Sequence, residues 1–182
     1  MINTVRKNGM KIIKMESKKI LLKSISIEDA EILMELNNNV EVSKYVVGNP
    51  IMVDMKQQLR WMKNLEKEKN TKRWIIIYDG ISVGTIILSN IDLKNLVGNM
   101  NIKILPASQG KGIAKIALKE ACRIAFEEEG LYCLTANILD YNIKSQKLFE
   151  SLGFHKDGIL RSRVVKGKER YDLFTYSLLK ND

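Results

Sequence analysis

The sequence predicts an α+β protein whose central sheet is mixed, mostly antiparallel and flanked by helices. Apolar segments on either side of short turn signals, such as Asp79-Gly80, indicate antiparallel strands. The amphipathic residues 112–129 indicate a long helix with one strand before it and one after it. A strand–helix–strand crossover joins parallel strands, so we expect one parallel pair within the antiparallel sheet.

The first third of the domain is predicted to hold one strand and two helices. Residues 19–23 are typical of a strand. Ser26 is placed as the N-cap of a helix that ends at residues 37–39, which are all asparagine. Asp54 begins a second helix, with Gln57 at the position of a capping box.

The middle and the end of the chain alternate between strands and helices. We expect an antiparallel meander that Pro106 ends, then the long helix with Gly130 just after it, a short helix capped by Asn142, and a C-terminal hairpin. Three acidic residues, 127–129, oppose the dipole at the end of the long helix, so packing must hold its last turn. The expected strands are 73–78, 83–88, 98–105, 131–139, 154–165 and 170–179.

Length and composition are typical of one globular domain. The 182 residues include 45% hydrophobic and 28% charged residues. We expect a basic arm over residues 1–18, extended or disordered, and a single domain over 19–182. No apolar run reaches the roughly 18 residues that a membrane helix needs, and the N-terminus lacks the apolar stretch of a secretory signal. We therefore expect a cytoplasmic protein.

Charge and rare residues limit the function classes. The formal charge is +9, which favours an anionic partner, although a merely solvated lysine-rich surface explains it equally well. Because His155 is the single histidine, a Ser-His-Asp hydrolase or a histidine-ligated metal centre is disfavoured, and we expect no metal. Cys122 and Cys133 match no metal or redox spacing.

Residues 106–114 join a strand to the start of the long helix. Free backbone N–H groups and the positive end of the helix dipole make such a junction an anion-binding site. Gly110 and Gly112 let the backbone approach a phosphate group, and Lys111 adds a charge. The segment lacks G-x-G-x-x-G and the Walker G-K-[ST], which disfavours a dinucleotide or a nucleoside triphosphate.

Two motifs resemble those of the GNAT superfamily of N-acetyltransferases. Gln109, Gly112 and Ala114 fit motif A, Q/R-x-x-G-x-G/A, and residues 142–154 fit N-x-x-S/A-x-x-L-Y/F-x-x-x-G-F. The strand–helix order over residues 19–180 is also similar. The resemblance implies a GNAT fold, in which the strands on either side of the long helix splay apart and form the cleft for acetyl-CoA.

The resemblance also implies residue roles, with acetyl-CoA as cosubstrate. The backbone near Ile102 and Ile104 would bond the pantetheine arm, the amides of 109–114 would hold the pyrophosphate, and a backbone N–H near Ile104 would stabilise the oxyanion. The implied acetyl-CoA residues are Ile102, Ile104, Gln109, Gly110, Lys111, Gly112, Ile113, Ala114, Asn142, Lys147 and Phe149.

Two positions depart from the family pattern. Phe149 replaces the tyrosine that often protonates the leaving thiolate, which leaves Ser145 or a water for that role. Asn99 stands where many relatives carry a glutamate base. The remaining candidates for the base are Glu35, Asp92, Glu169 and Asp172.

For the acceptor, the sequence favours a small anionic molecule with a free amine. Trp61 could stack on a ring, and Arg161, Arg163 and Tyr171 lie on the C-terminal hairpin, where Arg161 and Arg163 share one face by period two. Residues 158–179 look most like nucleotide-amino-sugar acetyltransferases, which suggests a UDP-linked aminodideoxysugar. Alternatives are the N-terminus of a protein such as a ribosomal protein, and then a polyamine. The alternative outside the acetyltransferases is a basic nucleic-acid-binding module, although the sequence contains no known nucleic-acid-binding motif. A homodimer is left open.

Overall fold

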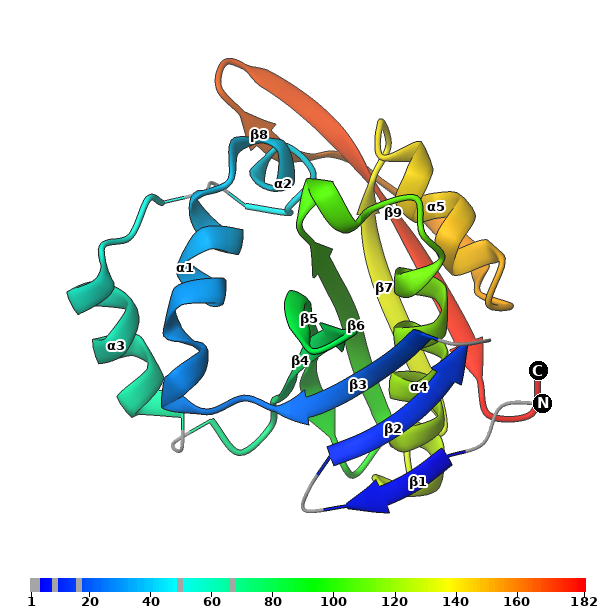
Figure 1. Ribbon diagram of the computed structural model, residues 1–182. Coiled ribbons are helices and arrows are strands. Elements are labelled where there is room, and N and C mark those ends of the chain that lie inside the picture. The colour runs from blue at the N-terminus through cyan, green and yellow to red at the C-terminus, as the bar shows by residue number, and fades with distance from the viewer. Residues whose placement is uncertain (1–3, 8–9, 16–17, 49–50, 66–67) are drawn as a thin grey trace.

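The computed structural model describes residues 4–7, 10–15, 18–48, 51–65 and 68–182. Within them one sheet of nine strands runs through the molecule in the order β1-β2-β3-β4-β5-β6-β7-β9-β8 (Figure 1). Its strands are β1 (Thr4–Lys7), β2 (Met10–Met15), β3 (Lys18–Ser24), β4 (Lys72–Tyr78), β5 (Ile81–Asp92), β6 (Val97–Ile104), β7 (Cys133–Leu139), β8 (His155–Lys166) and β9 (Glu169–Leu179). The helices are α1 (Ala30–Asn38), α2 (Val40–Ser43), α3 (Met55–Asn64), α4 (Ile113–Glu127) and α5 (Ile143–Glu150).

The expected parallel pair is β6 and β7, and it pairs over only part of its length. Register partners run from Val97↔Cys133 to Asn99↔Thr135, whereas β6 continues to Ile104 and β7 to Leu139. All other neighbouring strands are antiparallel. The prediction of an α+β fold with a mixed, mostly antiparallel sheet and a splayed parallel pair is confirmed.

Local signals place several elements where they were expected. Asp79 and Gly80 both have positive φ, 49° and 84°, and turn β4 into β5. At α3, Gln57 N–H donates to Asp54 Oδ1 at 2.7 Å while Asp54 N–H donates to Gln57 Oε1 at 2.9 Å, which completes the capping box.

Two hydrophobic clusters cover the two faces of the sheet. On one face, α4 packs against the central strands through Ile113, Ala117 and Ala121, and the same cluster contains Phe149 of α5. On the other face, α1 and α3 cover Ile75. Figure 1 shows the two helix pairs on opposite sides of the sheet. The central strands are therefore packed between two pairs of helices.

The basic N-terminal segment lies at the edge of this sheet. β1 pairs with β2 and β2 pairs with β3, both antiparallel, so the described parts of residues 1–18 continue the sheet beyond the expected first strand. Residues 1–3, 8–9 and 16–17 lie outside the described residues. The division of the chain at residue 18 stays a prediction.

Candidate active site

A cavity of about 560 Å³ opens where β6 and β7 separate. Met100 to Ile104 of β6 line one side and Ala136 to Ile138 of β7 line the other. The start of α4, the start of α5 and Val42, Tyr45, Val46 and Val47 complete the wall. The unpaired ends of the parallel strands therefore become a lined cavity, bordered by two helix N-termini.

The segment from Gln109 to Ala114 forms a cradle at the start of α4. Gly110 and Gly112 both have φ of +75°, and a Cβ built on either meets nothing within 4 Å, so the space over this backbone is open. The Gln109 side chain donates to the carbonyl of Ile104 at 3.0 Å and ties the cradle to the end of β6. Five of the six predicted cradle residues line the cavity, and Lys111 lies outside it.

The edge of β6 presents backbone amides to the same cavity. Leu105 N–H donates to Val83 O at 2.9 Å on the β5 side. Because N–H groups alternate along a strand, those of Ile104 and Ile102 point to the β7 side. There the β6–β7 ladder has already ended at Asn99. Both predicted backbone donors therefore face the cavity.

The start of α5 forms the wall opposite the cradle. Asn142 caps this helix, because its side chain accepts from Ser145 N–H at 3.2 Å. Ser145, Lys147 and Phe149 all line the cavity. Phe149 is 2% exposed and packs edge-on against Phe154, with the ring centroids 4.9 Å apart. The ring is therefore buried and forms part of the cavity wall.

The sequence from residue 19 to residue 155 matches the family model of the acetyltransferase (GNAT) domain. The chain belongs to the GNAT family. It is an N-acetyltransferase, and acetyl-CoA is the acetyl donor of the family. The open cradle and the free β6 edge fit a long, phosphate-bearing thioester, because the cradle offers helix-start amides to phosphate groups and β6 offers strand amides to an extended arm.

Proteins that are similar to this chain are named for different acetyl acceptors. Spermidine N(1)-acetyltransferase of Escherichia coli is 27% identical over 83% of this chain and 81% of its own length. YdaF of Bacillus subtilis, proposed to be a ribosomal N-acetyltransferase, is 28% identical over 90% of this chain and 92% of its own. The crystal structure of Vibrio cholerae spermidine N-acetyltransferase with CoA and spermine has a TM-score of 0.84 at 20% identity, covering 89% of this chain and 96% of that one.

The charge of the cavity wall is positive. Among the described residues, the side chains that line it include four lysines and no carboxylate. Lys115 and Lys144 lie in the first turns of α4 and α5, Lys147 lies in the last turn of α5, and Lys103 lies on β6. Burial lowers the pKa of Lys103 below its usual range. Lys103 could not be recognised from the sequence, because a lone lysine in a strand carries no motif.

None of the four carboxylates named as candidates for the base lines this cavity. Asp92 is the last residue of β5 and accepts hydrogen bonds from Lys94 and Asn95 of the following turn, and Asp172 accepts from Ser162 N–H at 2.7 Å. Asn99 has both ends of its amide engaged, since it donates to Thr135 at 3.1 Å and accepts from Asn101 at 2.8 Å.

The structure does not bring the predicted acceptor residues together at the cavity. Trp61 lies on α3, and Cζ of the Arg73 guanidinium lies over its ring, 5.3 Å from the ring centroid. Arg161 and Arg163 are exposed on β8, and Ser162 between them has φ of +48° within a bulge. Because this bulge interrupts the pleat, the shared face of Arg161 and Arg163 stays a prediction.

The predicted acceptor residue Tyr171 approaches the cavity only through other tyrosines. Its ring centroid lies 4.7 Å from that of Tyr141, which lies 6.0 Å from that of the cavity residue Tyr45. Two side chains hold the Tyr45 segment in place: Tyr141 Oη donates to Lys44 O, and Lys166 Nζ donates to Val46 O, both at 2.6 Å. The hairpin thus shapes the Tyr45 side of the cavity indirectly.

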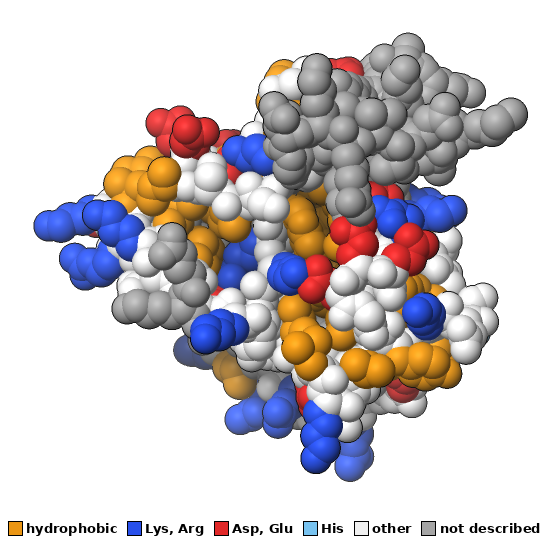
Figure 2. All heavy atoms as spheres, turned by 90° about the horizontal axis from the view of Figure 1, so that it is seen from below, with side chains coloured by type: hydrophobic (Ala, Val, Ile, Leu, Met, Phe, Trp, Pro, Cys, Tyr) orange, Lys and Arg blue, Asp and Glu red, His pale blue; other side chains and the backbone are white. Residues whose placement is uncertain are grey.

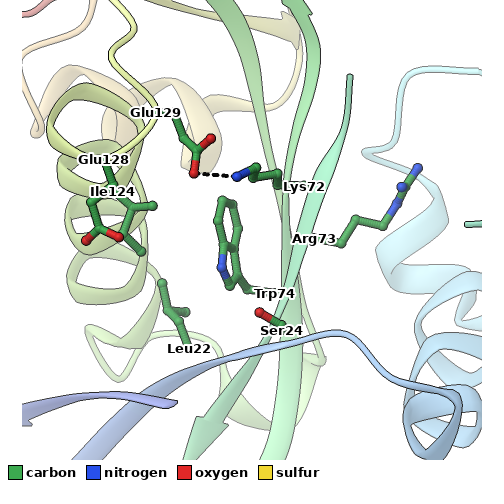
Figure 3. Close-up of a pocket in the computed structure, with 8 residues that line it drawn as sticks. All are labelled: Leu22, Ser24, Lys72, Arg73, Trp74, Ile124, Glu128 and Glu129. Carbon is green, nitrogen blue, oxygen red and sulfur yellow. Dashed lines mark ion pairs between the residues drawn. The ribbon is translucent and has the colours of Figure 1, made fainter. Parts of the chain in front are cut away.

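A second cavity of about 410 Å³ lies at the opposite end of α4 (Figure 3). Its charged groups are paired: Glu129 lies 2.5 Å from Lys72, and Glu128 lies 3.1 Å from Arg123. The Trp74 indole forms one wall, and the Arg73 side chain points away from it. Because these charges satisfy one another, we place the active site at the first cavity.

The described residues contain no group of three or more side chains that could hold a metal ion.

Proposed function

We propose that this protein acetylates the primary amine of a small anionic molecule, with a nucleotide-linked amino sugar as the best candidate. The observation that carries the proposal is the cavity wall, which contains four lysines and no carboxylate among the described residues. A polyamine carries several positive charges and is stabilised by acidic side chains, whereas an anionic acceptor is stabilised by this wall.

In this proposal the donor lies along the residues that the sequence motifs named. The amides of the cradle hold the pyrophosphate of acetyl-CoA, Asn142 bonds the pantetheine arm, and Lys147 and Phe149 flank the thioester. The amine attacks the thioester carbonyl directly, and positioning supplies much of the rate. Ile104 N–H stabilises the oxyanion that forms.

Proton transfer then relies on polar groups other than carboxylates. None of the carboxylates among the described residues lines the cavity, so the amine passes its proton to solvent through the open side. Ser145, or a water beside it, protonates the leaving thiolate, which needs only modest help because a free thiol has a pKa near 8.5.

An acetyl-CoA consumption screen tests the acceptor class. Nucleotide-linked amino sugars, peptides with ribosomal-protein N-termini and polyamines are compared at equal concentration. We expect the highest kcat/KM with the nucleotide-linked amino sugars. Preferred turnover of spermidine or of a peptide, with nucleotide sugars inert, would reject this acceptor and leave the acetyltransferase activity intact.

Two other acceptors have specific support and are decided by the same screen. Protein N-termini are the second candidate, because YdaF is 28% identical over most of both chains. Polyamines are the third, because the E. coli relative is a spermidine acetyltransferase at 27% identity. Figure 2 shows Lys and Arg side chains in several separate places on one face, between polar and apolar side chains, which gives little support to the nucleic-acid alternative.

Phe149→Tyr tests whether a protein acid limits the reaction. If proton delivery to the thiolate is partly limiting, the new hydroxyl should raise kcat by up to about tenfold. If Ser145 or a water already serves, the variant should be neutral or slower, because a buried unsatisfied hydroxyl costs about 1–3 kcal/mol.

Ser145→Ala, in both backgrounds, separates these cases by steady-state kinetics. A loss of kcat in the wild-type background alone would identify Ser145 as the donor route. Equal kcat with and without the Ser145 hydroxyl in both backgrounds, on both sides of pH 8, would show that this site needs no protein acid.

A further inference from the structure

Lys103 occupies a special position beside the proposed reaction centre. It lies on β6 between Ile102 and Ile104, whose amides face the cavity, and its own side chain lines that cavity. Successive side chains alternate across a strand, so Lys103 extends from the face of the sheet that carries Asn101 and that α1 covers. Lys103 is thus separated from the proposed oxyanion donor by a single peptide unit.

A short chain of amides holds the ammonium group in place. Lys103 Nζ donates to Asn37 Oδ1 at 3.0 Å, and Asn37 Nδ2 donates to Gln58 Oε1 at 3.4 Å. Gln58 is 2% exposed, and its Nε2 has no hydrogen-bond partner among the described residues. An ammonium can only donate, so it fixes the orientation of Asn37, which in turn fixes that of Gln58.

No carboxylate among the described residues forms an ion pair with this ammonium or lines the cavity beside it. Its hydrogen-bond partner is a neutral amide oxygen, and the cavity wall holds no carboxylate among the described residues. Burying a cation away from an anion is costly, so such a group is normally paired. An ammonium has three N–H donors and Asn37 accepts one, which leaves donors for a ligand on the open side.

We propose that Lys103, held by Asn37 and Gln58, anchors an oxyanion of the acceptor. This rests on the proposed function and deepens it, because it names the group that recognises the acceptor's negative charge. The oxyanion is a phosphate in a nucleotide-linked amino sugar and a carboxylate in an amino-acid-like acceptor. Binding there places the acceptor beside Ile104, where its amine reaches the thioester. The hairpin arginines, which the sequence analysis favoured for this role, lie outside the cavity wall.

Calorimetric binding to the CoA-saturated protein tests the anchor without turnover. The probes carry no amine: uridine diphosphate supplies phosphate and succinate supplies carboxylate. We expect the wild type to bind one of them and Lys103→Met to bind it at least tenfold more weakly. Lys94→Met, at an exposed turn outside the cavity wall, is the matched control and should keep the wild-type affinity.

Binding of uridine diphosphate, succinate and acetyl-CoA to the wild type and to Lys103→Met distinguishes the possible outcomes. Loss of uridine diphosphate binding in Lys103→Met identifies a phosphate anchor, and loss of succinate binding identifies a carboxylate anchor. Equal affinity of the wild type and Lys103→Met, or no binding of either probe to the wild type, would overturn the proposal even if the acceptor screen succeeds. An unchanged rise in melting temperature with acetyl-CoA shows that the variant is folded and its donor site intact.

Charge reversal gives an independent kinetic test. Lys103→Glu should lower kcat/KM for the anionic acceptor at least tenfold and raise that for spermidine, while KM for acetyl-CoA stays within about twofold. A general loss of turnover with every acceptor, in a variant that still binds acetyl-CoA, would contradict a role in acceptor charge recognition.

Discussion

Gly112→Val should abolish the rise in melting temperature that acetyl-CoA gives the wild-type protein. At a ligand concentration of about 100 times Kd, binding stabilises the native state by about 2.7 kcal/mol. For a domain of this size that corresponds to a shift of about 5–11 °C. The space over Gly112 is open, and its positive φ lets the backbone approach the pyrophosphate, so a valine side chain would occupy the place of the ligand.

Gly130→Val is the matched control, measured by the same thermal scans. Gly130 follows the other end of α4, has φ of +71° and also meets open space. Valine should introduce similar backbone strain at either glycine and lower both baseline melting temperatures. The shift with acetyl-CoA should survive in Gly130→Val alone. A full shift in a folded Gly112→Val protein would rule out the cradle as the donor site.

The two segments that we propose to bind the donor could be located from the sequence because each is local in the chain. Gln109 to Ala114 form one strand-to-helix junction, and residues 142–154 form one capped helix. Each segment therefore carries a readable motif, and the structure brings both to one cavity. The hairpin at Asp79-Gly80 and the capping box at Asp54 were predictable for the same reason, since the residue types required are neighbours in the chain.

The anchor that we propose for the acceptor could not be predicted, because its residues come from distant segments. Lys103, Asn37 and Gln58 lie on β6, α1 and α3, and only the folded sheet brings their side chains into hydrogen-bond distance. The choice of the hairpin arginines rested on a different premise. A period-two argument assumes an unbroken pleat, and nothing in the sequence of β8 indicates the bulge at Ser162.

The end of α4 shows a pairing that the sequence analysis missed. From the sequence, we expected packing alone to hold the last turn of this helix against its three acidic residues. Instead Arg123 lies 2.5 Å from Glu127 and 3.1 Å from Glu128, while Lys72 of β4 pairs with Glu129. Arg123 also donates two hydrogen bonds to the Glu120 carboxylate, of 2.6 Å and 3.0 Å. One cation therefore serves three carboxylates along the helix.

Arg123→Met should consequently be among the most destabilising substitutions in α4. The Glu120 side chain is 7% exposed, so removing Arg123 would leave a buried carboxylate without its counter-charge. Breaking such a pair costs about 3 kcal/mol, which lowers the melting temperature of this domain by about 6–12 °C. Arg60→Met, at an exposed position of α3, controls for the loss of a positive charge and should change it by less than about 2 °C.

The double variant Arg123→Met with Glu120→Gln separates the buried charge from the lost packing. Replacing both partners removes the uncompensated carboxylate, so at least half of the lost stability should return in a thermal or urea titration. If the double variant is as unstable as Arg123→Met, the arginine acts through its contacts with Glu127 and Glu128 or through its aliphatic stem. If Arg123→Met itself is neutral, solvent already compensates Glu120, and acid at the end of this helix needs no bound cation.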